Sequence, residues 1–322
     1  MAILITGSAG FIGFSIAKNL LKKKKNVIGI DNLNNYYSKK LKLKRISFLK
    51  KSKNFKFFKL DCSSSKFQNF FLKKKITMVI HLAAEVGVRN SFYNPNIYYQ
   101  NNLRSFFNVL EICKKKKSNL IFASSSSVYG SNDKTYFSES DDTSSPLSFY
   151  AATKKCNEIM AYSYTKNYKF SSIGIRFFNV YGPWGRPDMS IYKFTNLILS
   201  KKKLPLYGSG KQLRDFTYID DVVNLIDIII NKLNSERKGY FDIFNSGKGN
   251  SISILNLLKI LSSKLKINPK IQKKEKQIGD VFYTNSSSKK IKNKLNFEPN
   301  TSLKKGIDLF LDWYFEIGSK IK

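Results

Sequence analysis

The chain has 322 residues, of which 42% are hydrophobic and 14% aromatic. This length and composition suffice for one large domain, or two smaller domains sharing a cleft, and exclude a wholly disordered chain. The formal net charge of +35 would suit a nucleic-acid binder, but the basic residues are 50 Lys and only 7 Arg. Nucleic-acid readers favour arginine forks concentrated in one element. Because these lysines are spread in short runs, we expect a solvated lysine-rich surface and no nucleic-acid partner.

Cysteine usage and the apolar runs indicate a protein of a reducing compartment. Cys62, Cys113 and Cys156 are odd in number and widely spaced, and the single His completes no metal-ligand pattern. No apolar run approaches the roughly 18 residues of a membrane span. The short apolar run at the start lacks the basic leader of a signal peptide. We therefore expect a cytoplasmic protein with no metal and no membrane span.

Apolar runs alternate with helical patterns through the first half of the chain. Helices are expected at Phe11–Lys24, Asn101–Lys116 and Tyr150–Asn167, and strands at Ala2–Thr6, Asn26–Asp31, Phe55–Asp61, Thr77–Ala83, Asn119–Ser125 and Ser172–Val180. Strands alternating with helices predict an α/β fold with a doubly wound parallel sheet.

From about Asn179 the pattern changes to loops, a basic helix and short strands, one of them within Tyr240–Gly247. This change predicts a smaller mixed α/β part for substrate binding, interleaved with the first. The expected division gives residues 1–178 and a returning segment near 215–247 to the large part. Residues 179–214 and 248–322 then form the small part.

A glycine-rich turn, "ITGSAGFIG", follows the first expected strand and places Gly7, Gly10 and Gly13 at the start of a helix. Glycines there allow a tight turn and close approach of a pyrophosphate to the helix N-terminus. Asp31 ends the second strand about 20 residues later, where a carboxylate can accept from the adenosine ribose hydroxyls. An acid at this position favours NAD over NADP, because it would repel the extra phosphate.

The stretch "YAATK" places Tyr150 and Lys154 on one face of a helix. A phenol with a pKa near 10 is a poor base. A neighbouring ammonium and the positive nicotinamide ring would favour the phenolate and bring it into working range. Upstream, "SSSSVYG" (124–130) begins at the end of an expected strand.

These motifs, with "DC" at 61–62 and "HLAA" at 81–84, together resemble the extended short-chain dehydrogenases/reductases. The resemblance implies a Rossmann-type NAD-binding fold and a catalytic set of Ser125, Tyr150 and Lys154. His81 is interpreted as structural. The helices at 101–116 and 150–167 resemble the family's dimerising pair, so a homodimer is expected. The implied cofactor contacts are Gly7, Gly10, Phe11, Ile12, Gly13, Asp31, Asn32, Asp61, Cys62, Leu82, Ala83, Ala84, Asn101, Tyr150 and Lys154.

The stretch "FFNVYGPWGRPDMS" (177–190) closely resembles the UDP-glucuronate 4-epimerases, as do "RDFTYIDD" (214–221) and "QIGDV" (277–281). The resemblance implies that Arg186, Ser126 and Ser127 hold the sugar carboxylate, Arg214 the diphosphate and Asp280 the uridine ribose. Arg89 and Asn179 complete the implied substrate contacts. The implied reaction converts UDP-glucuronate to UDP-galacturonate through a 4-keto sugar. Tyr150 takes the C4 hydroxyl proton and NAD takes the C4 hydride.

Other activities of this scaffold stay open. Asn179 stands where these epimerases often have Thr and matches the UDP-galactose epimerases, so UDP-glucose is an alternative substrate. Glu85 stands where they often have Gln. A UDP-glucuronate decarboxylase is disfavoured because Ser126 and Ser127 are neutral where such enzymes carry an acid. A catalytically silent NAD-binding or nucleic-acid-binding relative is disfavoured by the intact Ser125, Tyr150 and Lys154.

Overall fold

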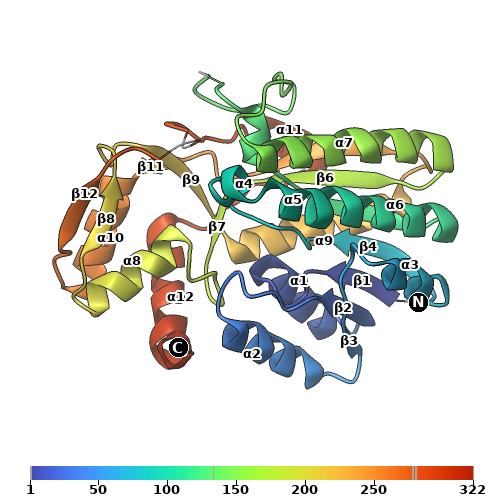
Figure 1. Cartoon of the computed structure of the whole chain (residues 1–322), viewed down its shortest axis with the longest axis horizontal. Helices are drawn as coiled ribbons and strands as arrows, with labels where there is room; N and C mark the ends of the chain where they lie inside the picture. The colour runs from blue at the N-terminus through green and yellow to red at the C-terminus, as the bar shows by residue number, and fades with distance from the viewer. Residues whose placement is uncertain (1, 133, 278, 280, 322) are drawn as a thin grey trace.

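The computed structural model describes residues 2–132, 134–277, 279 and 281–321. Its largest element is a seven-stranded sheet with the order β10-β6-β5-β4-β1-β2-β3, in which all neighbouring strands pair in parallel (Figure 1). This is the doubly wound Rossmann-type sheet that the alternating pattern predicts. The strands are β1 (Ala2–Thr6), β2 (Val27–Asp31), β3 (Phe55–Lys59), β4 (Ile76–His81), β5 (Asn119–Ser125), β6 (Ser172–Phe177) and β10 (Phe241–Ser246).

Helices cover both faces of this sheet because successive strand residues point to opposite sides. Leu4 joins the core beneath α3 (Ser65–Leu72), α6 (Ser105–Lys116) and α7 (Phe149–Tyr168). The next residue, Ile5, joins the core beneath α1 (Phe11–Lys22), α2 (Lys39–Lys50) and α9 (Ile219–Ser235). Uninterrupted apolar strands are the sequence signature of such a two-sided core.

A smaller mixed α/β part lies beside the carboxyl ends of the parallel strands, on the left of Figure 1. In it, β9 (Leu213–Tyr218) pairs in parallel with β7 (Asn179–Tyr181) and antiparallel with β11 (Ser251–Ser253). A second pair, β8 (Leu204–Tyr207) and β12 (Ile271–Lys274), is parallel. The helices here are α8 (Ser190–Leu199), α10 (Ile254–Leu265) and α12 (Leu303–Glu316).

The remaining described elements are short. They are α4 (Asn90–Tyr93), α5 (Pro95–Tyr98), the π-helical turn η1 (Tyr99–Arg104), the 3-10 turns η2 (Ser126–Tyr129) and η3 (Gly318–Lys320), and α11 (Lys289–Leu295).

Two elements differ from the sequence-based prediction. The single strand expected over 172–180 is broken into β6 and β7, because β6 pairs with β5 and β10 in the large sheet whereas β7 pairs with β9 in the small one. The helix expected from Asn101 begins as the π-helical turn η1, and α6 starts at Ser105.

The chain crosses between the two parts more than once. Strand β10 returns to the large sheet and pairs with β6, whereas β9, just before it in sequence, lies in the small sheet. The exact division at 178, 214 and 247 stays a prediction.

Within the described part of the chain, no helix combines the length and apolar character needed to cross a membrane. The same residues contain no group of three or more His, Cys, Asp or Glu side chains placed to hold a metal ion.

Candidate active site

The glycine-rich turn leaves an open cradle between β1 and α1. Gly7 has φ of +70°, and a Cβ there would meet the Ala83 backbone nitrogen at 2.8 Å, so glycine is required. Gly10 precedes α1 without any side-chain cap, which leaves the first N–H groups of that helix available to an anion. The cradle suits a pyrophosphate.

The carboxyl ends of β2 and β3 carry the groups expected at the adenosine end. Asp31 accepts from the backbone N–H groups of Ala9 (3.1 Å) and Leu33 (2.8 Å), which fixes its carboxylate beside the turn, and burial raises its pKa. Asn32 donates to Asp61 (3.0 Å). Burial alone would raise the pKa of Asp61, but hydrogen bonds from Asn32 and Ser63 outweigh it and lower that pKa. Asp61 is therefore held as an acceptor.

The single histidine lies beneath this cradle. Its Nδ1 is 2.8 Å from the Thr6 hydroxyl, and the ring is 5.5 Å from that of Phe106. Burial, with a contribution from Lys154, lowers the pKa of His81 to about 3. A neutral buried imidazole that ties β4 to β1 agrees with the structural role expected for it.

The three predicted catalytic residues lie together where β5 meets α7. Ser148 caps α7 by accepting from the Ala151 N–H (3.1 Å), which brings Tyr150 into the first turn. Burial raises the pKa of the Tyr150 phenol, whereas a hydrogen bond from Ser125 and the charge of Arg186 lower it. The Lys154 ammonium donates to Ala123 O (3.1 Å) and lies 6.0 Å from the centre of the Tyr150 ring. Ser125 is thus the direct partner of the phenol, and Lys154 acts on it at a distance.

The pKa of Lys154 sets an upper pH limit for its expected role in the site. Burial lowers its pKa to about 8, so the ammonium charge is present below that pH and is lost as the pH rises through it. Without the charge the phenolate of Tyr150 is less favoured. We therefore expect the catalysed rate, measured as kcat/KM, to decline above about pH 8. The test is a pH–rate profile from pH 6 to 10, and a profile that is flat from 8 to 9.5 would contradict this role.

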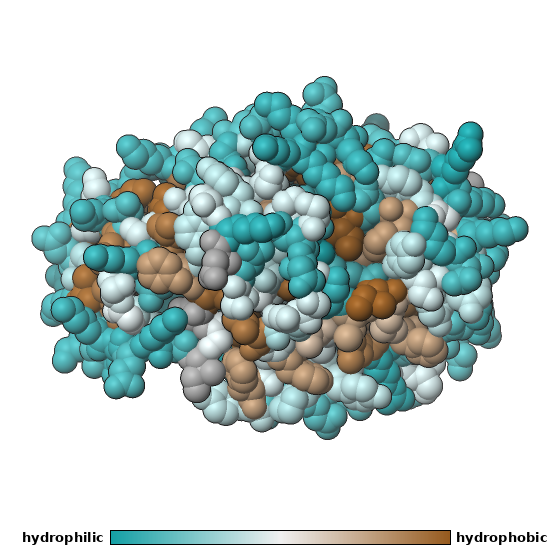
Figure 2. Space-filling view, turned by 90° about the horizontal axis from the view of Figure 1, so that it is seen from above, coloured by the Kyte–Doolittle hydropathy of each residue, from teal (hydrophilic) through white to brown (hydrophobic). Residues whose placement is uncertain are grey.

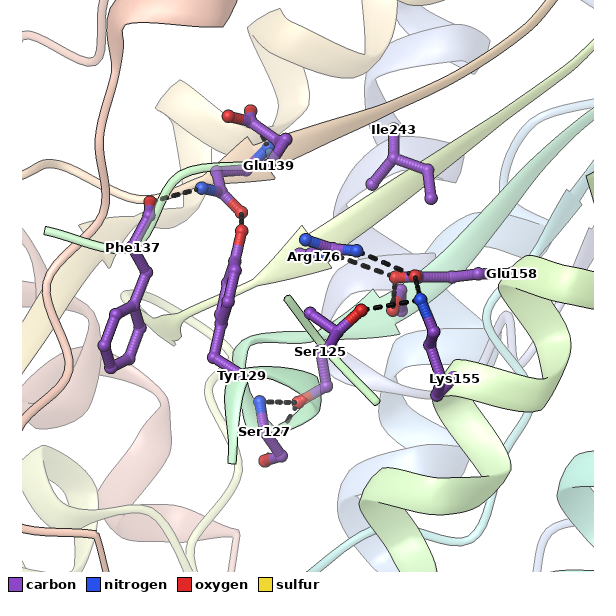
Figure 3. Close-up of polar contacts among 12 residues, drawn as sticks. Ser125, Ser127, Tyr129, Phe137, Glu139, Lys155, Glu158, Arg176 and Ile243 are labelled. Carbon is purple, nitrogen blue, oxygen red and sulfur yellow. Dashed lines mark hydrogen bonds and ion pairs between the residues drawn. The ribbon is translucent and has the colours of Figure 1, made fainter. Parts of the chain in front are cut away.

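A buried ion pair anchors α7, the helix that carries Tyr150 and Lys154 (Figure 3). Glu158 follows Tyr150 and Lys154 on the same face of α7. Its carboxylate takes two bonds of 2.8 Å from Arg176 on β6, and a third of 2.6 Å from the Ser124 hydroxyl on β5. The Arg176 and Glu158 side chains are only 3% and 2% exposed. The pair therefore ties α7 to the two strands that end at the active site.

Removing Glu158 would leave Arg176 as a buried charge without its ion-pair partner. Glu158→Gln should lower the free energy of unfolding by about 3–5 kcal/mol, measured by urea denaturation. The matched control is Glu236→Gln, which breaks a more exposed helical pair with Lys232 (2.7 Å) and should cost about 0.5 kcal/mol or less. Equal losses in both variants would show that the Glu158–Arg176 pair contributes no more than a surface pair.

The groups expected to hold substrate line the same cleft. Ser126 and Ser127 begin η2 directly after β5, and Ser127 N–H donates to the Ser125 hydroxyl (3.2 Å). Arg186 forms a two-point pair with Asp188, at 3.1 and 2.5 Å. Arg89 lies 5.2 Å from the centre of the Tyr207 ring. Arg214 donates to Leu213 O (2.8 Å) and Phe282 O (3.3 Å).

One cleft of about 690 Å³ brings these groups together. All the site residues expected from the sequence line it, Asn179 and Asn101 included, with a single exception. That exception is Asp280, which lies outside the described residues.

Sequence reasoning missed part of this lining, namely Asn34, Tyr36, Lys42 and Asp188. Glu85, noted only as a departure from the epimerase pattern, is central among them. Its carboxylate accepts from Asn34 (3.3 Å) and Asn101. Burial raises the pKa of Glu85, and the hydrogen bond from Asn101 and the charges of Lys42 and Arg186 reduce that rise only in part. The polar run "NLNNYY" after Asp31, and the acid two residues after Arg186, were the available signals.

Comparison with known proteins gives this cleft a context. Residues 3–247 match the family model described as "NAD dependent epimerase/dehydratase family". The chain belongs to this family. As an epimerase/dehydratase family member it is 39% identical to protein CapI of Staphylococcus aureus, over 99% of this chain and 100% of that protein. It is also 39% identical to UDP-glucuronate 4-epimerase 4 of Arabidopsis thaliana, over 98% of this chain and 75% of that one.

The fold of this epimerase/dehydratase matches solved structures closely. A UDP-glucuronic acid 4-epimerase from Bacillus cereus, in complex with UDP-glucuronic acid and NAD, superposes with a TM-score of 0.91 at 31% identity, covering 98% of this chain and 100% of that one. The open glycine turn and the fixed Asp31 carboxylate fit the pyrophosphate and ribose of NAD.

Proposed function

We propose that this protein is an NAD-dependent UDP-glucuronate 4-epimerase, which interconverts UDP-glucuronate and UDP-galacturonate. The observation that carries the proposal is the position of Arg186. This guanidinium lines the same cleft as the catalytic set, and its charge lowers the pKa of Tyr150. A guanidinium beside the reacting hydroxyl offers two parallel donors to a hexuronate carboxylate, which a neutral sugar would leave unused.

Tyr150, Ser125 and Lys154 have different roles in the reaction at C4. Tyr150 accepts the proton of the C4 hydroxyl and returns it after the sugar has presented its other face. Ser125 donates to the Tyr150 oxygen and stabilises the negative charge that develops there. Lys154 maintains a positive potential around the phenol. NAD, when bound, supplies a two-electron acceptor that is regenerated within each turnover.

The first experiment is incubation of the purified protein with UDP-glucuronate and no added NAD, followed by proton NMR of the sugar. Appearance of UDP-galacturonate would support the 4-epimerase with a retained cofactor. A UDP-pentose as sole product would assign decarboxylation instead. If NAD has to be added and only UDP-glucose reacts, the alternative favoured by Asn179 replaces this proposal.

A homodimer is part of the proposal. Exposed apolar side chains lie on adjoining helices α4, α5, α6 and α7, where Tyr93, Ile97, Phe107, Ile159 and Tyr162 form an outward patch. Figure 2 shows one face of the molecule, on which apolar side chains lie in several places among mostly hydrophilic ones. Patches of this kind on a globular protein mark contact surfaces.

A cytoplasmic location also belongs to the proposal. Cys62, Cys113 and Cys156 are all free thiols, and Cys156 is exposed. An exposed free thiol suits a reducing compartment.

A further inference from the structure

Arg186 already holds a carboxylate in this structure. Its Nε donates to Asp188 Oδ1 (3.1 Å) and one terminal nitrogen donates to Asp188 Oδ2 (2.5 Å), so one complete edge of the guanidinium is engaged. The guanidinium also donates to the Tyr36 hydroxyl and lies 5.4 Å from the centre of that ring. A two-point pair of this kind is the geometry with which arginine binds any carboxylate, a sugar's included.

We propose that Asp188 is a specificity-determining residue, which occupies on Arg186 the place of the substrate's carboxylate and must be displaced by it. This rests on the proposed function of Arg186 as the group that holds the hexuronate carboxylate. Asp188 then sets how strongly a uronate is preferred over a neutral sugar, because only a carboxylate can compete for the guanidinium.

Exposure shows that this pair can open. The Arg186 and Asp188 side chains are 20% and 36% exposed, and both line the cleft. The Arg176–Glu158 pair has the same two-point geometry but is 3% and 2% exposed, and neither residue lines the cleft. Neither water nor substrate can reach the buried Arg176–Glu158 pair, whereas water or a substrate carboxylate can reach the guanidinium of Arg186.

The backbone around the pair is fixed, so the exchange involves side chains. The fully buried Arg45 donates to the carbonyl oxygens of Trp184 (2.5 Å) and Gly185 (3.2 Å), and to Ala9 O (2.8 Å) in the glycine turn. The Met189 N–H donates to Arg186 O (3.2 Å), closing a turn across Asp188. The backbone on either side of Asp188 is thereby tied to the Arg186 carbonyl and, through Arg45, to the glycine turn.

The test compares Asp188→Asn with the unmodified protein on two substrates. A partly exposed ion pair contributes little free energy. Loss of the competing Asp188 carboxylate should therefore lower KM and Kd for UDP-glucuronate by roughly twofold to fivefold. UDP-glucose, which carries the same diphosphate and no carboxylate, should bind with unchanged affinity. An unchanged or higher KM for UDP-glucuronate would overturn the proposal, because Asp188 would then orient Arg186 rather than compete.

A second variant separates competition for Arg186 from the general electrostatic effect of removing one negative charge from the cleft. Glu85→Gln removes one negative charge from the same cleft, but the Glu85 carboxylate bonds to Asn34 and Asn101 rather than to the Arg186 edge. We expect a smaller gain in UDP-glucuronate affinity from Glu85→Gln than from Asp188→Asn. Equal gains would overturn the proposal in favour of a field effect.

The Kd values come from calorimetry with Asp188 intact or replaced in a Tyr150→Phe background, where turnover is slow, so they test Asp188 apart from the reaction. Failure of the unmodified protein to convert UDP-glucuronate would reject the proposed function. If Asp188→Asn does not lower the Kd for UDP-glucuronate, only the proposal that Asp188 competes for Arg186 is rejected.

Discussion

Tyr150→Phe is expected to lower kcat for UDP-glucuronate by roughly 10²- to 10⁴-fold, the range typical for loss of a positioned general base. The variant keeps the buried ring and its 6.1 Å edge contact with Tyr98, and loses only the hydroxyl bonded to Ser125. No other described phenol accepts from Ser125, so the C4 hydroxyl would have no base at that position. Substrate and NAD binding should stay close to normal, because the hydroxyl is one contact among many.

The measurement is the rate of UDP-galacturonate formation by proton NMR, with calorimetric Kd values for UDP-glucuronate. Tyr162→Phe is the matched control, since it removes a phenol hydroxyl from the same helix at a position that is 53% exposed and outside the cleft. It should retain the full rate. If the rate of Tyr150→Phe lies within threefold of that of the unmodified protein, Tyr150 is not the general base.

Arg186→Ala is expected to lower kcat/KM for UDP-glucuronate by roughly 30-fold or more, the cost of truncating one partner of a hydrogen-bonded charge pair. The loss has two sources. The sugar carboxylate loses its two-point donor, and Asp188 is left as an unpaired negative charge in the cleft. Turnover of UDP-glucose should change far less.

The same variant tests control of a side reaction. A ketone at C4 is β to the C6 carboxylate, and β-keto acids lose carbon dioxide readily. A guanidinium that holds the carboxylate away from overlap with the carbonyl suppresses that loss. Arg186→Ala should therefore release some UDP-pentose, visible by NMR beside the hexuronates. Arg186→Lys, which keeps the charge but loses the fork, should give an intermediate effect. Unchanged affinity and product purity in Arg186→Ala would remove both roles from Arg186.

The predicted site was recoverable from sequence wherever its residues follow the ends of strands. Gly7, Asp31 and Ser125 come directly at or after apolar runs, and the carboxyl ends of parallel strands meet at one edge of the sheet. Helical spacing places Tyr150 and Lys154 on one face of a helix, and the family resemblance predicts their roles. These are short-range regularities of the backbone, and a sequence displays them.

Pairings between distant elements were not recoverable. Arg176 directly precedes the motif that contains Arg186, yet it is buried against Glu158 and does not line the cleft. Nothing local distinguishes the two arginines, because their exposure depends on how α7 packs over β5 and β6. The break at Phe178 likewise depends on β9, which comes later in the chain and pairs with β7 in the small sheet.

The sequence by itself therefore determined the Rossmann-type sheet and the NAD cradle, because each rests on periodicity or on spacing within one strand–helix unit. The catalytic set of Ser125, Tyr150 and Lys154 is a prediction that rests on the family resemblance. Only the tertiary structure decided the electrostatics of the site. It placed Ser125 rather than Lys154 against the Tyr150 phenol, buried Lys154 enough to lower its pKa to about 8, and paired Arg186 with Asp188. Charge–charge energies depend on distance and burial in three dimensions, and no linear pattern of residues specifies either.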